Sequence, residues 1–173
     1  TLFRSVPSNR GYEADVIAPS ALPCPDKVPG PDGVPAETAL PRALAADELP
    51  ALAAEFATAA RNARAAGIDG VELHASSGYL INQFLNPASN HRTDAFGGLA
   101  ENRIRFPLEV FAAMRQVFDG VLGIRISASD WVDGAWDVAQ SAEFAKRIKA
   151  LGCDFIHVSS GGVSPAQKIA VGP

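Results

Sequence analysis

Clustered lysines and arginines are missing from this sequence of 173 residues, and the formal net charge is −4. Because nucleic-acid-binding surfaces concentrate basic side chains, we expect no nucleic-acid partner. No apolar run reaches the roughly 18 residues that a membrane-spanning helix requires, so we expect no membrane partner. The chain also does not open with a charged segment followed by an apolar one, and we therefore expect a cytoplasmic protein.

Cysteine and histidine are scarce, which restricts the metal chemistry that can be predicted. The two cysteines lie far apart and lack the spacing of metal ligands. Three histidines are present, but they form no His-x-His or His-Glu-x-x-His pair. No metal site is therefore assigned. A metal-dependent hydrolase that uses His74, His157 and a carboxylate such as Glu72 or Asp130 stays open as a minor alternative.

Apolar residues make up 47% of the chain, which is enough for the hydrophobic core of one domain. Residues 1–45 hold most of the prolines and are predicted to be loop-rich, with a short extended piece at Val16–Leu22 and an irregular loop at Pro23–Pro41. Residues 46–173 form the predicted core of helices and strands. The chain begins at Thr1 without a methionine and ends in a loop-like run, so we interpret it as an internal fragment of a longer domain.

Periodicity predicts three strands separated by helices. The predicted strands are Gly70–Ala75, Val121–Ala128 and Phe155–Ser160. The predicted helices run from Asp47 (N-cap) to about Ala66, with Gly67 as the stop, from Ala100 to Phe118, and from Asp137 (N-cap) to Leu151. Pro107 lies inside the second helix, which is therefore expected to kink or to start twice. This order of elements predicts parallel strands joined by right-handed crossovers.

Side chains on alternate residues of a strand point to opposite faces of a sheet. One predicted face is apolar and suits packing beneath helices: Val71, Leu73, Leu122, Ile124, Ile126, Ile156 and Val158. The other face is polar: Glu72, His74, Arg125, Ser127, His157 and Ser159. A doubly wound sheet has helices on both faces, whereas a barrel can turn a polar set toward its centre. The pattern therefore favours an α/β fold of the TIM (β/α)8 barrel type, of which the chain holds about three central βα units.

Catalytic side chains of such barrels lie at the carboxyl ends of strands and in the loops that follow. Three residues meet this condition: His74 and Arg125 on strands, and Tyr79 in a loop. The loop at Ala75–Leu99 is far longer than the roughly two to six residues usual after a strand, which is typical of functional loops. An inward-facing Arg125 needs an acceptor, which either a cofactor or Glu72 can supply.

Several segments resemble the Old Yellow Enzyme family of FMN-dependent NAD(P)H:flavin oxidoreductases, in the branch of the thermophilic-like and xenobiotic reductases. The similar segments cover nearly the whole chain: Val16–Leu22, Gly67–Leu85, Ser89–Gly98, Glu101–Phe106, Gly123–Asp130 and Asp154–Gly162. The Arg-Thr-Asp, Gly-Gly and Glu-Asn-Arg groups that follow one another within residues 92–103 are the most specific part of the resemblance.

The resemblance implies a TIM barrel that binds FMN at its carboxyl-terminal mouth. NAD(P)H would reduce the flavin, which would then pass hydride to the C=C bond of an activated alkene such as an enone or a nitroalkene. Tyr79 would be the proton donor, and phenols are protonated at neutral pH. His74 would bind the substrate oxygen close to the flavin, and Arg125 would contact the flavin's pyrimidine edge. A homo-oligomer of the full-length protein is compatible with this resemblance.

Ser77 departs from the family pattern, which has a second His or an Asn at this position. A serine hydroxyl can still donate a hydrogen bond to the substrate oxygen, but it reaches less far. The loss of one such donor costs roughly 10²–10³ in rate. We therefore assign Ser77 to substrate binding and keep a non-catalytic fragment or pseudoenzyme of the same fold as the alternative.

The other polar residues of the specific segments are expected to hold the long loop rather than to act on a substrate: Arg92, Asp94, Asn102, Arg103 and Arg105. His91 is expected at the surface, and His157 is expected to pair with Glu72. The remaining flavin contacts that the resemblance implies are outside this sequence. We therefore expect the chain alone to bind FMN weakly or not at all, to be inactive, and to aggregate through exposed strand edges.

Overall fold

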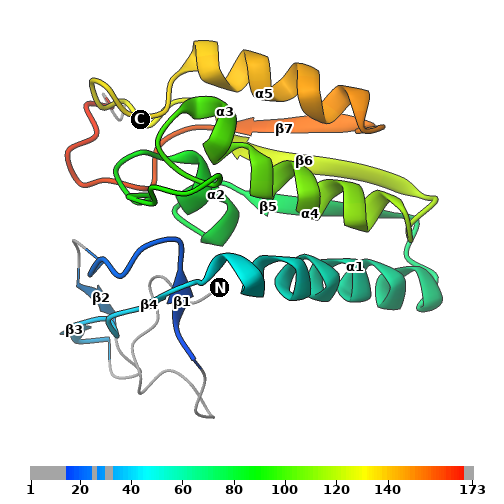
Figure 1. The fold of residues 1–173 in the computed structure, drawn as a ribbon, viewed down its shortest axis with the longest axis horizontal. Coiled ribbons are helices and arrows are strands. Elements are labelled where there is room, and N and C mark those ends of the chain that lie inside the picture. Colours follow the sequence, from blue (N-terminus) through cyan, green and yellow to red (C-terminus); the bar gives the residue numbers. More distant parts are fainter. Residues whose placement is uncertain (1–14, 25–26, 30–32, 170–173) are drawn as a thin grey trace.

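The main sheet of the protein consists of three parallel strands. In this computed structural model, the described residues are 15–24, 27–29 and 33–169. The strands lie in the order β5 (Gly70–Ala75), β6 (Val121–Ser127) and β7 (Phe155–Ser159). The three predicted strands and their parallel order are confirmed, although β6 and β7 each end one residue earlier than expected. All three strands end on the side where the long loops gather (Figure 1).

Helices connect and cover the strands. They are the 3-10 helix η2 (Ala46–Glu48) and the α-helices α1 (Leu49–Ala65), α2 (Leu80–Leu85), α3 (Ala100–Arg103), α4 (Arg105–Arg115) and α5 (Val138–Ala150). The long helices α1, α4 and α5 run alongside the strands (Figure 1), and α4 packs against both α1 and α5. None of the helices that the structure describes has the length and apolar character of a membrane span.

The start of α1 differs from the prediction in its capping residue. Asp47 lies inside η2 and does not cap the helix, so the prediction was wrong. Instead, the Glu48 carboxylate accepts a hydrogen bond from the backbone N–H of Ala45 at 2.7 Å. A 3-10 turn precedes the α-helix and moves the capping contact upstream of Asp47. Gly67, with a φ of +81°, ends the helix as predicted.

The second predicted helix starts twice, as its proline suggested. Its first part, α3, ends at Arg103, and α4 begins at Arg105 after Ile104. Pro107 lies in the first turn of α4, where a backbone N–H has no partner within the helix in any case. The third helix, α5, is confirmed with its cap, because the Asp137 side chain accepts from the N–H of Gln140 at 2.8 Å.

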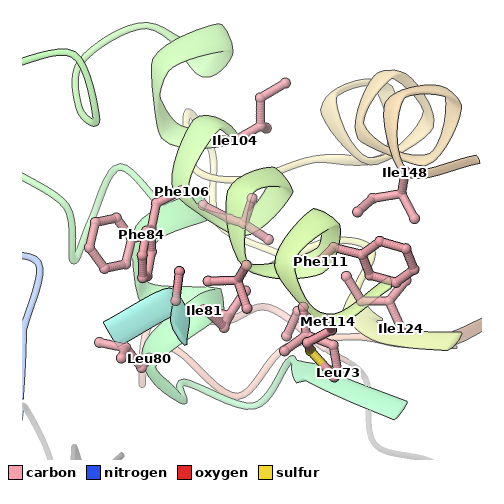
Figure 2. Packing of buried hydrophobic residues seen from close by; sticks show 14 of the residues in the cluster. Leu73, Leu80, Ile81, Phe84, Ile104, Phe106, Phe111, Met114, Ile124 and Ile148 are labelled. Carbon is pink, nitrogen blue, oxygen red and sulfur yellow. The ribbon is translucent and has the colours of Figure 1, made fainter. Parts of the chain in front are cut away.

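Apolar side chains fill the space between the sheet and its helices (Figure 2). Phe111 of α4 is fully buried, as are Leu73 and Ile124 of the sheet, and the rings of Phe84 and Phe106 lie with their centroids 4.5 Å apart. Burying a side chain of this size contributes about 1.5–3 kcal/mol. The core therefore fixes the strands relative to α2 and α4, and with them the positions of the strand ends.

The two faces of the sheet differ as the alternation of the sequence predicts. Toward the helices, Leu73, Leu122 and Ile124 are buried, although Val158 near the end of β7 is 65% exposed. The opposite face carries Glu72, His74, Arg125 and His157, together with Phe155, whose ring lies over Gly123. The structure thus confirms a parallel α/β arrangement in which one face is apolar and covered by helices.

The N-terminal segment contains two short strand pairs. β1 (Ile17–Ala18) pairs in parallel with β4 (Arg42–Ala43), and β2 (Val28–Pro29) pairs antiparallel with β3 (Pro35–Ala36). The predicted extended piece is confirmed at β1. The prediction of an irregular loop at residues 23–41 was wrong in part, because this segment contains the antiparallel pair of β2 and β3. Arg42 joins the segment to η2 through an ion pair with Glu48 at 2.7 Å.

Candidate active site

The carboxyl ends of β5 and β6 bring the predicted site residues together. His74 of β5 is the register partner of Arg125 of β6, which is in turn the register partner of His157 of β7. Tyr79 lies at the end of the turn that follows β5. In parallel α/β folds, ligand sites form at this edge of the sheet because the loops after the strands converge there.

The chain leaves β5 through a tight turn. Its two central residues, Ser77 and Gly78, have φ values of +59° and +76°. The N–H of Tyr79 donates to the carbonyl oxygen of Ser76 at 3.2 Å and closes the turn. Two successive positive φ values are typical of a type I′ turn, in which Asn-Gly is favoured, so a serine at the first position is unusual. The turn delivers Tyr79 to the start of α2, as its N-cap residue.

Tyr79 has a fixed backbone and a half-exposed ring. Two buried amides of α2 hold the turn: Asn82 Oδ1 accepts from the N–H of Gly78 at 2.9 Å, and Gln83 Nε2 donates to the Gly78 carbonyl at 2.8 Å. Tyr79 is 43% exposed, and its ring centroid is 4.7 Å from that of His74. A phenol that is held at its base and reaches solvent can donate a proton to a bound molecule.

The surroundings of His74 favour its neutral imidazole form. Burial is the main cause that lowers its pKa below the usual value, and the positive charge of Arg125 lowers it further, partly offset by Glu72. A neutral imidazole has one N–H donor and one acceptor nitrogen. His74 can therefore donate one hydrogen bond to a substrate oxygen without adding a charge.

Arg125 is anchored by hydroxyl groups. Its Nη1 donates to Ser76 Oγ at 2.8 Å and to Ser77 Oγ at 3.4 Å. Glu72, one of the two partners considered for Arg125, instead lies 3.2 Å from His157 Nδ1, which confirms the predicted pair of Glu72 and His157. Within the described residues, the Nε and Nη2 groups of Arg125 have no hydrogen-bond partner. A guanidinium has five N–H donors, so several of them remain for a ligand.

Contacts between loops hold the turn in place. The N–H of Ser77 donates to Ser127 Oγ at 3.2 Å, and the Ser127 hydroxyl donates to the carbonyl of Gly161 at 2.8 Å. The polar alternation of β6 pointed to Ser127, whereas Ser76 and the glycines were not predicted. Ser76 follows His74 by two residues and shares its parity, which is the signal that could have found it. No local signal identifies Gly161 or Gly162, because their contacts join separate loops.

The long loop after α2 is held by the residues that were assigned to structure. The contacts run from Arg92 to Asp94, from Arg103 to Leu85 and Gln140, and from Arg105 to Ala95 and Asn102. Arg103 is only 6% exposed, so its backbone and amide partners replace water around a buried charge. His91 is exposed, as expected. The predicted structural role of this segment is confirmed.

Among the described residues, those of the metal-hydrolase alternative do not form one set of metal ligands. Glu72 pairs with His157, while Asp130 is buried and accepts from Asn86 and from the N–H of Trp136. Among the residues that the structure describes, no group of three or more His, Cys, Asp or Glu side chains is placed to hold a metal ion. The geometry therefore gives this alternative no support.

Comparison with known protein families gives one match over most of the sequence. The model of the NADH:flavin oxidoreductase / NADH oxidase family matches residues 9–169. The NADPH dehydrogenase of Bacillus subtilis (strain 168) is 42% identical over 155 residues, which are 90% of this chain and 43% of the relative. The NADPH dehydrogenase of Geobacillus sp. (strain WCH70) is 43% identical over 161 residues, 93% of this chain and 44% of the relative. The chain thus spans less than half the length of these curated relatives.

Solved structures agree with the sequence matches. Morphinone reductase in complex with tetrahydroNAD superimposes with a TM-score of 0.71 at 38% identity, over 82% of this chain and 42% of that one. The Old Yellow Enzyme homologue from Zymomonas mobilis gives a TM-score of 0.74 at 34% identity, over 87% of this chain and 43% of that one.

Proposed function

Because a single family model extends over nearly the whole sequence, the chain belongs to the NADH:flavin oxidoreductase / NADH oxidase family, and we propose that it is part of an FMN-dependent oxidoreductase that uses NAD(P)H to reduce activated C=C bonds. The proposed acceptors are enones, nitroalkenes and similar electron-poor alkenes. The proposed fold of the full-length protein is a TIM barrel in which β5, β6 and β7 are neighbouring strands.

The convergence of His74, Tyr79 and Arg125 at one sheet edge is the observation that carries this proposal. The rings of His74 and Tyr79 are in contact, and Arg125 is the register partner of His74. Reduction of an activated alkene needs a donor for the activating oxygen, a proton source for the α-carbon and a cation beside an electron-rich redox group. These three side chains have the chemistry for these three tasks.

The donors of Arg125 fit FMN. The pyrimidine edge of the flavin presents carbonyl and nitrogen acceptors, and a fixed guanidinium can donate to them while its charge stabilises the reduced ring. Arg125 is fixed through Ser76 and Ser77 and keeps N–H groups available among the described residues. When bound, FMN supplies the two-electron redox chemistry, with NAD(P)H as the reductant. Arg125 and His74 are the residues of this chain that we propose to hold it.

His74 and Tyr79 would act on the acceptor. As a neutral imidazole, His74 donates an N–H to the carbonyl or nitro oxygen, which gathers negative charge as the alkene is reduced. Tyr79 then gives the phenolic proton to the α-carbon. Ser77 adds a short hydroxyl donor, which is also 3.4 Å from Arg125. Because His74 is a strong hydrogen-bond donor and Ser77 a weak one, we expect the site to prefer alkenes that are already strongly activated.

The test is made on the full-length protein. Purified protein should be yellow, NADPH should bleach its visible absorbance under anaerobic conditions, and an enone or nitroalkene should restore it. A preparation that binds no flavin would overturn the proposal. Bleaching without restoration by any activated alkene would overturn the proposed class of acceptors. A flavin that NADPH does not bleach would support the non-catalytic alternative, for which Ser77 is the specific observation.

A further inference from the structure

Ser76 is a fully buried hydroxyl between two residues of the candidate site. It is 0% exposed, and its Oγ accepts a hydrogen bond from Arg125 Nη1 at 2.8 Å. The same oxygen lies 3.5 Å from Nδ1 of His74, at the long end of the hydrogen-bond range. Ser76 thus lies in a chain of polar contacts that runs from Arg125 to His74.

The contacts with Arg125 and Ser77 set the donor and acceptor roles at Ser76 Oγ. Arginine only donates, so Ser76 Oγ is the acceptor toward Arg125. Without a bound acceptor, the Ser77 hydroxyl is placed as a second donor to Ser76 Oγ, at 3.5 Å. Both lone pairs of Ser76 Oγ then accept, one from Arg125 and one from Ser77, so its single proton is directed to His74 Nδ1.

A hydrogen bond received at Nδ1 decides which nitrogen of a neutral imidazole carries the proton. Nδ1 must present its lone pair to the Ser76 hydroxyl, so the proton stays on Nε2. Burial and the charge of Arg125, which lower the pKa of His74, keep the ring in this neutral form. The ring then has one N–H donor, at Nε2, on the side away from Ser76.

We propose that Ser76 is a positioning residue that connects Arg125 to His74 and fixes the His74 tautomer in which Nε2 carries the proton. This inference rests on the proposed function in one respect, namely that the Nε2–H is the group offered to the activating oxygen of the acceptor. In the other tautomer, the nitrogen facing the acceptor would present a lone pair to an oxygen that gains negative charge. Ser76 therefore keeps a hydrogen-bond donor where the proposed reaction needs one.

The tautomer can be read directly in the full-length protein labelled with ¹⁵N-histidine. Long-range ¹H–¹⁵N spectra distinguish protonated from unprotonated ring nitrogens, and the signals of His74 are identified by their loss in His74→Gln. At neutral pH the wild-type protein should show protonation of Nε2 alone. Ser76→Ala should give a mixture of both tautomers, and Ser76→Thr, which keeps the hydroxyl, should restore the single form.

Ser129→Ala is the matched control, because the Ser129 hydroxyl follows β6 and accepts from the N–H of Trp131 but, among the described residues, makes no contact with Ser76, Arg125 or His74. Its His74 tautomer should stay unchanged. In Ser76→Ala, kcat/KM for an activated alkene should fall about tenfold, less than the roughly 10²–10³ expected for a donor that is lost completely.

Two results would overturn the proposal: a wild-type His74 that is protonated on Nδ1, or a Ser76→Ala protein that keeps a single Nε2–H tautomer. The wild-type spectrum alone is decisive if Ser76→Ala does not fold. These readings need no turnover, so they are separate from the flavin and acceptor measurements that test the proposed function.

Discussion

Gly162 and the α-carbon of Ser77 lie so close together that a β-carbon added to Gly162 would be 2.9 Å from it. Ser77 belongs to the turn after β5, and Gly162 belongs to the loop after β7. Both have positive φ values, +59° for Ser77 and +92° for Gly162. The loop after β7 therefore limits where the turn can lie, and this turn carries Ser77 and leads to Tyr79.

We predict that Gly162→Ala moves this turn. Any non-glycine residue at such a φ is destabilising by about 1–2 kcal/mol, and the contact with the Ser77 backbone adds an overpacking cost of about 1–3 kcal/mol. Gly134→Ala is the control, because Gly134 has a φ of +75° and no atom within 4 Å of the added carbon. Urea unfolding of the full-length variants measures both effects. Equal losses of stability in the two variants would show that Gly162 does not press on Ser77.

Tyr79→Phe should separate the two half-reactions of the proposed enzyme. The phenylalanine ring keeps the contact with His74, whose centroid is 4.7 Å away, and removes only the phenolic proton. Reduction by NADPH should continue at the wild-type rate, while reoxidation by an enone should slow by about 10²–10⁴. Stopped-flow absorbance of the flavin records both steps. An unchanged rate of reoxidation would assign the proton to another donor.

Ser77→Asn and Ser77→His should tighten the binding of phenolic ligands to the oxidised full-length protein. Asn and His are enriched at positive φ, so the turn at Ser77, with its φ of +59°, accepts them readily. One added hydrogen bond contributes about 1 kcal/mol, or roughly a fivefold gain in affinity. Titration of the long-wavelength charge-transfer band measures this affinity, with Ser77→Ala as the control that adds no donor. Unchanged affinity in both variants would mean that Ser77 does not occupy the second donor position.

Elements governed by short-range sequence could be predicted well. The strand at Gly70–Ala75 has the expected bounds, and Asp137 caps α5 as expected, because alternation and capping act within a few residues. The prediction that Asp47 caps α1 was wrong for a local reason, because a 3-10 turn competes with the first turn of an α-helix. The short hairpin of β2 and β3 was missed because its prolines and glycines resemble those of an irregular loop.

The candidate site was predicted only in part. Strand parity correctly placed His74, Arg125 and His157 on one face, and their register confirms that placement. Their catalytic and cofactor-binding roles stay predictions. The contacts of Ser76 with Arg125 and of Ser77 with Gly162 join residues that are far apart in the chain, and they depend on turn geometry that residue types alone do not reveal.

Asp130 gives a prediction about pH and stability. It is 1% exposed, its Oδ1 is buried without a hydrogen-bond partner among the described residues, and burial raises the pKa of its carboxyl to about 6. An unfolded aspartate has a pKa of about 3.9. Between about pH 4 and pH 6 the folded state therefore keeps a proton that the unfolded state releases. The stabilisation from this proton is complete below about pH 4 and is lost as the pH rises through 6.

Asp130→Asn removes this titration and keeps an oxygen for the donors of Asn86 and Trp136. Its free energy of unfolding relative to the wild-type protein should therefore increase by about 2 kcal/mol between pH 4.5 and pH 7.5, because pH 4.5 lies roughly 1.5 units below the folded pKa of about 6 and one pKa unit corresponds to about 1.4 kcal/mol. Asp133→Asn in the same loop is the control. Lys168 lowers the pKa of the exposed Asp133 carboxyl, so that variant should gain no stability as the pH rises. Denaturant unfolding of the full-length proteins across this pH range measures both effects. A constant difference in the free energy of unfolding between Asp130→Asn and wild type would mean that Asp130 is already ionised in the folded state at pH 4.5.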